Sequence, residues 1–150
     1  MNARTGRFIN FVSANKTNGV KTEDKGINDF RNQWYYKKSS PGSKDGVFVI
    51  ISKASGMVLD HFNGSRIEAY TDNMVNDPHH CWKVIPCSCG KDYYEIVNVA
   101  TGRYLEERVT GTPNANATQL MDMSKDGRAQ CWNIMSPEGC VFDNLFTDDY

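Results

Sequence analysis

The stretch IVNVATGRYLE, residues 96–106, places a short apolar run on each side of a Thr-Gly pair. Residues 50–60, IISKASGMVLD, repeat this order with Ser-Gly in the middle, and residues 1–10, MNARTGRFIN, keep its second half. Glycine tolerates the positive φ that a tight turn between two strands requires. The three stretches therefore predict strand turns at Gly6, Gly56 and Gly102.

Each of these glycines is followed by one of the three tryptophans of the chain. They are Trp34, Trp82 and Trp132, which lie 28, 26 and 30 residues after their glycines. Other apolar runs are short and rich in β-branched and aromatic residues, as in strands. The period indicates three copies of a unit of roughly four strands, each with an inward-pointing indole on its last strand. Because one unit cannot bury its apolar face alone, we predict an all-β fold, a β-trefoil with a pseudo-threefold axis.

The ends of the chain depart from this period. Repeat one lacks a full strand before Gly6, whereas 18 residues follow Trp132. We predict that Cys140–Phe146 supplies the missing strand, so that the termini lie side by side in one domain over residues 1–150. The expected units are repeat one at about 1–40 plus 138–150, repeat two at about 46–86, and repeat three at about 91–137.

The composition limits the partners that we expect. Basic and acidic side chains number 17 and 18, and no Lys/Arg block is present that would neutralise a phosphate backbone, so nucleic acid is not an expected partner. No apolar run approaches the roughly 18 residues of a membrane span, and the N-terminus lacks the apolar segment of a signal peptide. We expect a cytoplasmic protein without membrane insertion, whose five cysteines are mostly reduced thiols.

Two histidines and a cysteine stand together in NDPHHCW, residues 76–82, and raise the question of a metal site or a thiol–base pair. Neighbouring residues of an extended strand point to opposite faces, so His80 and Cys81 would not converge on one ligand. The fragment Cys87-Ser88-Cys89 is the remaining metal candidate, if it folds back towards Cys81. We nevertheless expect no metal site, no cofactor and no catalytic pair.

The repeated segments resemble the ricin-B-type (R-type) lectins, in particular the fungal and related cytosolic members. VFVIISKASGMVLD and YYEIVNVATGRYLE resemble the opening of that family's repeat, with a strand, a Ser/Thr-Gly turn, a strand and Leu-Asp. NQW, NDPHHCW and QCW resemble its closing Gln-x-Trp motif, although the Gln position holds Asn32, His80 and Gln130 in turn. The resemblance covers the whole chain if the permuted ends are accepted, and it implies a β-trefoil with a shallow sugar site in each repeat.

In such a site the resemblance implies three groups. An Asp after Leu accepts two sugar hydroxyls, an aromatic ring stacks on the C–H face of the sugar, and an Asn, Gln or His near the Trp completes the set. Repeat two offers Asp60 as the carboxylate and Tyr70 as the stacking ring. The candidate polar partners are Asn73, Asn76 and His79. The structural alternatives are a turn cap for Asp60, a cross-strand aromatic for Tyr70 and a solvated loop histidine for His79.

The other two repeats depart from this set. Repeat three has Glu106 in the carboxylate position and Met121 near the stacking position, and repeat one has Asn10 and Glu23. We therefore expect one intact site, in repeat two. Glu106 and Glu107 are adjacent in a strand and should face apart, unlike the paired carboxylates of a glycosidase, so we expect no enzyme.

The leading hypothesis is a lectin for galactose- or GalNAc-type glycans and glycoconjugates. Single sites of this kind bind on the order of mM, so a homodimer would supply the missing valency. The alternative is a trefoil-type protease inhibitor or protein–protein interaction module, acting through the long polar loop Val109 to Thr118. A non-binding accessory domain is the third reading.

Overall fold

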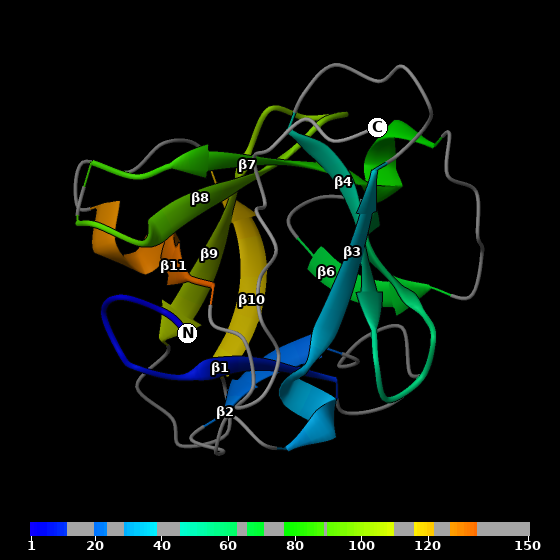
Figure 1. Ribbon diagram of the computed structural model, residues 1–150, viewed down its shortest axis with the longest axis horizontal. Coiled ribbons are helices and arrows are strands. Elements are labelled where there is room, and N and C mark those ends of the chain that lie inside the picture. Colours follow the sequence, from blue (N-terminus) through cyan, green and yellow to red (C-terminus); the bar gives the residue numbers. More distant parts are fainter. Residues whose placement is uncertain are drawn as a thin grey trace.

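The computed structural model describes residues 1–11, 20–23, 29–38, 46–62, 66–70, 77–88, 90–109, 116–121 and 127–134 (Figure 1). Within these ranges the chain forms eleven strands, all paired antiparallel, and three short 3₁₀ turns. No helix in these ranges is long and apolar enough for a membrane crossing. The predicted all-β class is confirmed.

The elements follow the three repeats in chain order. The first contains β1 (Phe8–Phe11), β2 (Val20–Glu23), η1 (Phe30–Asn32) and β3 (Trp34–Lys38). The second contains β4 (Val47–Ser52), β5 (Val58–Phe62), β6 (Arg66–Tyr70), η2 (Pro78–His80) and β7 (Cys81–Pro86). The third contains β8 (Tyr93–Asn98), β9 (Tyr104–Val109), β10 (Asn116–Met121), η3 (Gly127–Gln130) and β11 (Cys131–Asn133).

The three predicted glycine turns share one geometry. In each turn the glycine amide donates a hydrogen bond to the carbonyl four residues earlier, over 2.8–2.9 Å. The φ angles are +71° at Gly6, +72° at Gly56 and +68° at Gly102, in the left-handed region that side chains disfavour. The sequence pattern therefore identified these turns correctly.

The three tryptophans are also equivalent. Each indole Nε1 donates to the carbonyl three residues after the glycine of its own repeat. The pairs are Trp34 with Ile9 (3.0 Å), Trp82 with Leu59 (3.0 Å) and Trp132 with Leu105 (2.9 Å). Trp82 and Trp132 are fully buried in the central core with Leu59 and Leu105, and the partly buried Trp34 packs against the same cluster. The prediction that the three indoles meet in a common core is confirmed.

A second recurring contact joins one repeat to the next. The carbonyl of the residue before each tryptophan accepts a hydrogen bond from the hairpin turn of the following repeat. The donors and acceptors are Lys53 and Gln33 (3.0 Å), Val99 and Cys81 (2.9 Å), and Ala3 and Cys131 (2.8 Å). Because the last of these pairs links repeat three back to repeat one, the three repeats form a closed ring.

The N-terminus takes part in this closure, and Figure 1 shows it beside β11. The Met1 ammonium group donates to the Asn133 carbonyl at 2.7 Å, and Asn2 pairs with Trp132. Ser52 and Asn98 hold the same position opposite Trp34 and Trp82. Asn2 therefore takes the place that the last residues of β4 and β8 take in the other two repeats. Cys140–Phe146 and the C-terminus lie outside the described residues, so their contribution stays a prediction.

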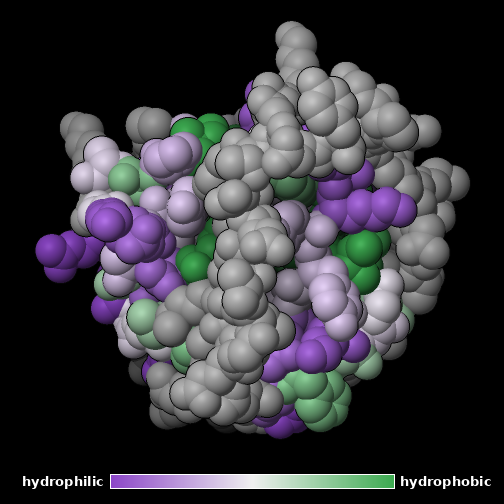
Figure 2. Space-filling model, viewed as in Figure 1, coloured by the Kyte–Doolittle hydropathy of each residue, from purple (hydrophilic) through white to green (hydrophobic). Residues whose placement is uncertain are grey.

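The coloured residues on the face shown in Figure 2 are largely polar. Apolar residues appear there in small separate areas rather than in one extended patch. Among the described residues, the large apolar side chains that are exposed are Phe30, Tyr35, Tyr36, Ile85 and Val99. Scattered exposure of this kind is normal for a protein surface and does not by itself indicate a docking site.

We predict that Trp82→Phe lowers the free energy of unfolding. The change leaves the buried Leu59 carbonyl without its donor, which costs about 1–3 kcal/mol, and loss of the larger ring adds to this. Urea denaturation followed by circular dichroism measures the loss. Trp34→Phe is the matched control, because its indole is only partly buried, and it should cost less. Equal losses at the two positions would contradict this account of the core.

Candidate functional site

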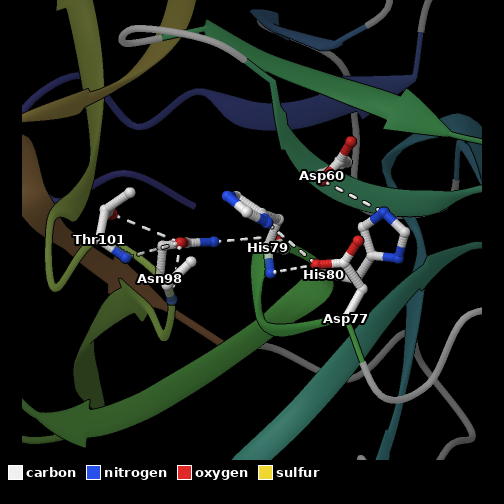
Figure 3. A network of polar contacts seen from close by, with 7 residues as sticks. Asp60, Asp77, His79, His80, Asn98 and Thr101 are labelled. Atoms are coloured by element: carbon white, nitrogen blue, oxygen red, sulfur yellow. Dashed lines mark hydrogen bonds and ion pairs between the residues drawn. The ribbon is translucent and has the colours of Figure 1, made fainter.

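Asp60 lies on β5 immediately after Leu59, whose carbonyl receives the Trp82 indole. Its side chain is buried, and the residue is only 5% exposed. The ring of His80, at the end of η2, places Nε2 3.3 Å from Asp60 Oδ1, and this ring is equally buried (Figure 3). The core bond of Trp82 therefore positions a buried Asp–His pair, because it ties β5 to the strand that follows η2.

The same pairing of positions occurs in repeat three. Gln130, two residues before Trp132, donates from Nε2 to Glu106 Oε2 at 3.0 Å. Glu106 follows Leu105 as Asp60 follows Leu59. In repeat two His80 thus occupies the position of Gln130, as the sequence motif predicted. Asp60 occupies the position of Glu106. Repeat one has Asn10 and Asn32 at these positions, and hence no carboxylate.

The turn η2 is held by Asp77, which precedes it. Asp77 Oδ1 accepts the His79 backbone N–H at 2.9 Å and lies 3.0 Å from His79 Nδ1. The carbonyl of His79 accepts Asn98 Nδ2 at 2.9 Å (Figure 3). The exposed ring of His79 stacks on the ring of His61, with ring centroids 5.9 Å apart. The His79 ring is therefore held at the surface by Asp77 and His61, and its backbone by Asn98.

The pKa values of the two carboxyl groups in this network, Asp60 and Asp77, are shifted in opposite directions. Burial raises the pKa of Asp60 above its ordinary value, while the His80 ring and the His61 backbone N–H partly oppose that shift. The His79 backbone N–H holds the pKa of the more exposed Asp77 below its ordinary value. Asp77 is thus an ionised cap of η2, whereas an ionised Asp60 is held at a cost in stability.

The structure brings together only part of the predicted residue set. Asp60 lies in the network of Figure 3, one residue from His61, on whose ring His79 stacks. Tyr70 lies on β6 opposite Val58, two pairs along from the Asp60–Glu68 pair, and its side chain is outside the described part of the structure. Asn73 and Asn76 fall outside the described residues. The roles of Tyr70, Asn73 and Asn76 stay predictions.

Sequence reasoning missed three members of the network, namely His61, Asp77 and Asn98. A signal existed for Asp77, since Asp before Pro is a common start of a helical turn. His61 and Asn98 become neighbours of His79 only through the tertiary fold, and Asn98 belongs to a different repeat. No local pattern of the sequence indicates such contacts.

The adjacent residues Glu106 and Glu107 face apart, as predicted. Glu106 meets Gln130, whereas Glu107 is fully buried and accepts hydrogen bonds from the hydroxyls of Thr5 and Thr22 in repeat one. Arg4 adds a bond to the Glu107 carbonyl. Glu107 therefore links two repeats inside the protein and does not form a carboxylate pair with Glu106.

The expectation of mostly reduced cysteines is wrong for one pair. Cys87 and Cys131 form a disulfide, although 44 residues separate them. Cys87 follows β7 and Cys131 begins β11, and both strands flank β8, which brings their Cα atoms to 6.4 Å. Cys81 is a buried thiol that packs with Val49 and Val58. Cys89 and Cys140 lie outside the described residues.

Comparison with known proteins identifies the fold. No family model matches the sequence, and no curated protein matches it. A BEL β-trefoil crystal structure matches with a TM-score of 0.67 at 20% identity, over 88% of this chain and 87% of the other. The chain has the β-trefoil fold. The fold implied by the ricin-B-type resemblance is thereby confirmed.

Two further solved structures agree. The designed threefold-symmetric protein ThreeFoil has a TM-score of 0.65 at 18% identity, over 89% of this chain and 93% of the other. SeviL, bound to the asialo-GM1 saccharide, has a TM-score of 0.66 at 13% identity, over 91% and 93%. At such identities the likeness extends to the backbone arrangement of this trefoil and not to particular side chains.

We predict that Asp60→Asn raises the free energy of unfolding at neutral pH. A carboxyl with a raised native pKa binds its proton more tightly in the native state, so its contribution to stability falls as the pH rises through the raised value. Asn removes this loss. Urea denaturation at pH 7 and near pH 4, the ordinary carboxyl value, should show the advantage of the variant shrinking at the lower pH. A variant that is less stable than the parent protein at pH 7 would contradict the cost assigned to burial of the Asp60 charge.

Proposed function

We propose that this β-trefoil binds glycans through repeat two and carries out no catalysis. The observation that carries the proposal is the buried Asp60 carboxylate, which lies 3.3 Å from the His80 ring. The next residue along the chain on each side of this pair contributes to a second contact, because His61 stacks on the exposed ring of His79. An ionised carboxylate only accepts hydrogen bonds, and its about four lone-pair sites exceed the contacts with His80 and the His61 amide. Asp60 thus retains the capacity to accept sugar hydroxyls.

The cost of the buried charge supports the same conclusion. Burial raises the pKa of Asp60, so the fold would be more stable with a neutral residue at this position. Repeat one has the neutral Asn10 at the equivalent place, buried and compatible with the fold. A carboxylate that the architecture does not need is best explained by a ligand. A sugar hydroxyl is suitable, because a charged acceptor strengthens such hydrogen bonds.

The proposed ligand is a galactose- or GalNAc-type glycan. Tyr70 would stack on the apolar face of the ring, and Asn73, Asn76 and His79 would donate to its remaining oxygens. His79 is the best supported of these, because Asp77 and His61 hold its ring in place before any ligand arrives. A side chain fixed in advance loses less conformational entropy on binding. The saccharide-bound state of SeviL gives a precedent for a sugar ligand on this fold.

Repeat two would contain the single strong sugar site of the chain. Repeat one lacks the carboxylate, and the longer Glu106 of repeat three is held by Gln130. Single shallow sites bind on the order of mM, so we propose that a homodimer supplies useful avidity. The interaction-module alternative rests on the connection between β9 and β10, whose residues 110–115 lie outside the described part, and no observation favours it.

We predict that Asp60→Ala weakens binding to galactose- or GalNAc-terminated glycans by at least about tenfold, because a charge-assisted acceptor is lost. Binding to a broad glycan array, followed by ligand-observed NMR titration with galactose and GalNAc, measures the change.

Asn10→Ala and Glu106→Ala are the matched controls, since they alter the equivalent positions of repeats one and three. Both should bind like the parent chain. The proposal fails if the parent chain binds no glycan on the array, or if Asp60→Ala binds as well as the two controls.

A further inference from the structure

A cluster of metal-ligating side chains lies where the last strand of repeat two meets repeat three, outside the proposed sugar site. The Sγ atoms of Cys87 and Cys131 and a carboxylate oxygen of Glu95 all lie within 4.8 Å of one another. Glu95 on β8 is directly opposite Cys131 on β11, and on its other side it is opposite Ile85, two residues before Cys87. Because antiparallel partners share a face, three neighbouring strands direct these groups to one place.

Repeat two provides an internal comparison. Cys81 precedes Trp82 as Cys131 precedes Trp132, and Val49 faces Cys81 across the sheet as Glu95 faces Cys131. In repeat two Cys81 packs against the aliphatic side chains of Val49 and Val58. The trefoil can therefore be built with an aliphatic side chain at this position. Packing therefore does not require the Glu95 carboxylate beside Cys131.

The charge of Glu95 is not balanced within the described part of the chain. Its side chain is partly buried and makes no hydrogen bond or ion pair with the residues that the structure describes. A partly buried carboxylate without a counter-charge is unfavourable, and a bound cation would supply the missing charge.

We propose that reduction of the Cys87–Cys131 disulfide opens a site for one divalent cation of the zinc class, held by the two thiolates and Glu95. Thiolate ligands select such soft or borderline metals over magnesium or calcium. Three protein ligands from this chain leave a fourth position to water. With Zn–S bonds of about 2.3 Å, the two sulfurs would lie about 3.8 Å apart, which a Cα separation of 6.4 Å accommodates.

The reaction balances with a thiol reductant. Two external thiols give up two electrons and two protons to the disulfide and become a disulfide themselves, leaving Cys87 and Cys131 as thiols. Binding of the metal ion then releases two protons, because the ligands are thiolates. The disulfide and the metal complex are thus alternative links between the last strands of repeats two and three. These ligands differ from the Cys81–Cys87–Cys89 combination that the sequence suggested and that we did not expect to bind metal.

The test uses the full chain and Co²⁺ as a coloured substitute for Zn²⁺. The protein is reduced with a phosphine, which becomes the phosphine oxide with oxygen taken from water, and is then titrated with Co²⁺ under nitrogen. We expect thiolate-to-cobalt charge-transfer absorption that saturates at one equivalent, disappears on addition of Zn²⁺, and is absent from the oxidised protein.

Variants identify the ligands. Cys87→Ser and Glu95→Gln, both at incompletely buried positions, should each weaken Co²⁺ binding by at least about tenfold. Cys81→Ser is the matched control, at the equivalent position of repeat two, and should leave the affinity unchanged. Near-ultraviolet circular dichroism of the buried tryptophans checks that each variant is folded. If Cys87→Ser does not fold, Glu95→Gln alone tests the ligand assignment.

Three results would overturn the proposal. They are no charge-transfer absorption in the reduced parent chain, equal absorption in the oxidised chain, and a loss in Cys81→Ser as large as that in Cys87→Ser or Glu95→Gln. None of them depends on sugar binding, so the metal site and the proposed function fail or stand separately.

Discussion

The hydrogen bond from each tryptophan indole to a main-chain carbonyl is the interaction on which the molecule depends. It occurs three times with the same donor atom, at 2.9–3.0 Å. It ties the strand after each glycine turn to the last strand of the same repeat. Because the accepting residue directly precedes Asp60 in repeat two, the bond that builds the core also fixes the backbone of the candidate site. Stability and site geometry are therefore coupled in this fold.

The three repeats use one backbone plan with different side chains. The position after the carbonyl acceptor holds Asn10, Asp60 and Glu106, and the position two before the tryptophan holds Asn32, His80 and Gln130. Repeat one has an amide at both places, and Asn10 is buried there. The buried carboxylate of repeat two and the carboxylate of Glu95 beside two sulfurs, between repeats two and three, are less favourable for folding. These departures from the common plan are the two places at which we propose ligand binding.

The sequence predicted the architecture well because its signals are periodic and local. Glycines at left-handed turns and tryptophans in register require no knowledge of the tertiary structure. The candidate site was only partly predictable. Asp60 and His79 follow from the motif, but His61 and Asn98 join it through contacts between strands or repeats. The Cys87–Cys131 disulfide was missed for the same reason, since β8 separates the two strands that carry the cysteines.

A crystal structure of the chain with bound galactose or GalNAc tests the central claim most directly. We expect sugar hydroxyl oxygens within hydrogen-bond distance of the Asp60 carboxylate, with the ring beside His79. We also expect the equivalent places at Asn10 and Glu106 to be empty at the same sugar concentration. A sugar bound at those places and absent from Asp60 would contradict the claim, because the carboxylate held by His80 would then have no part in recognition.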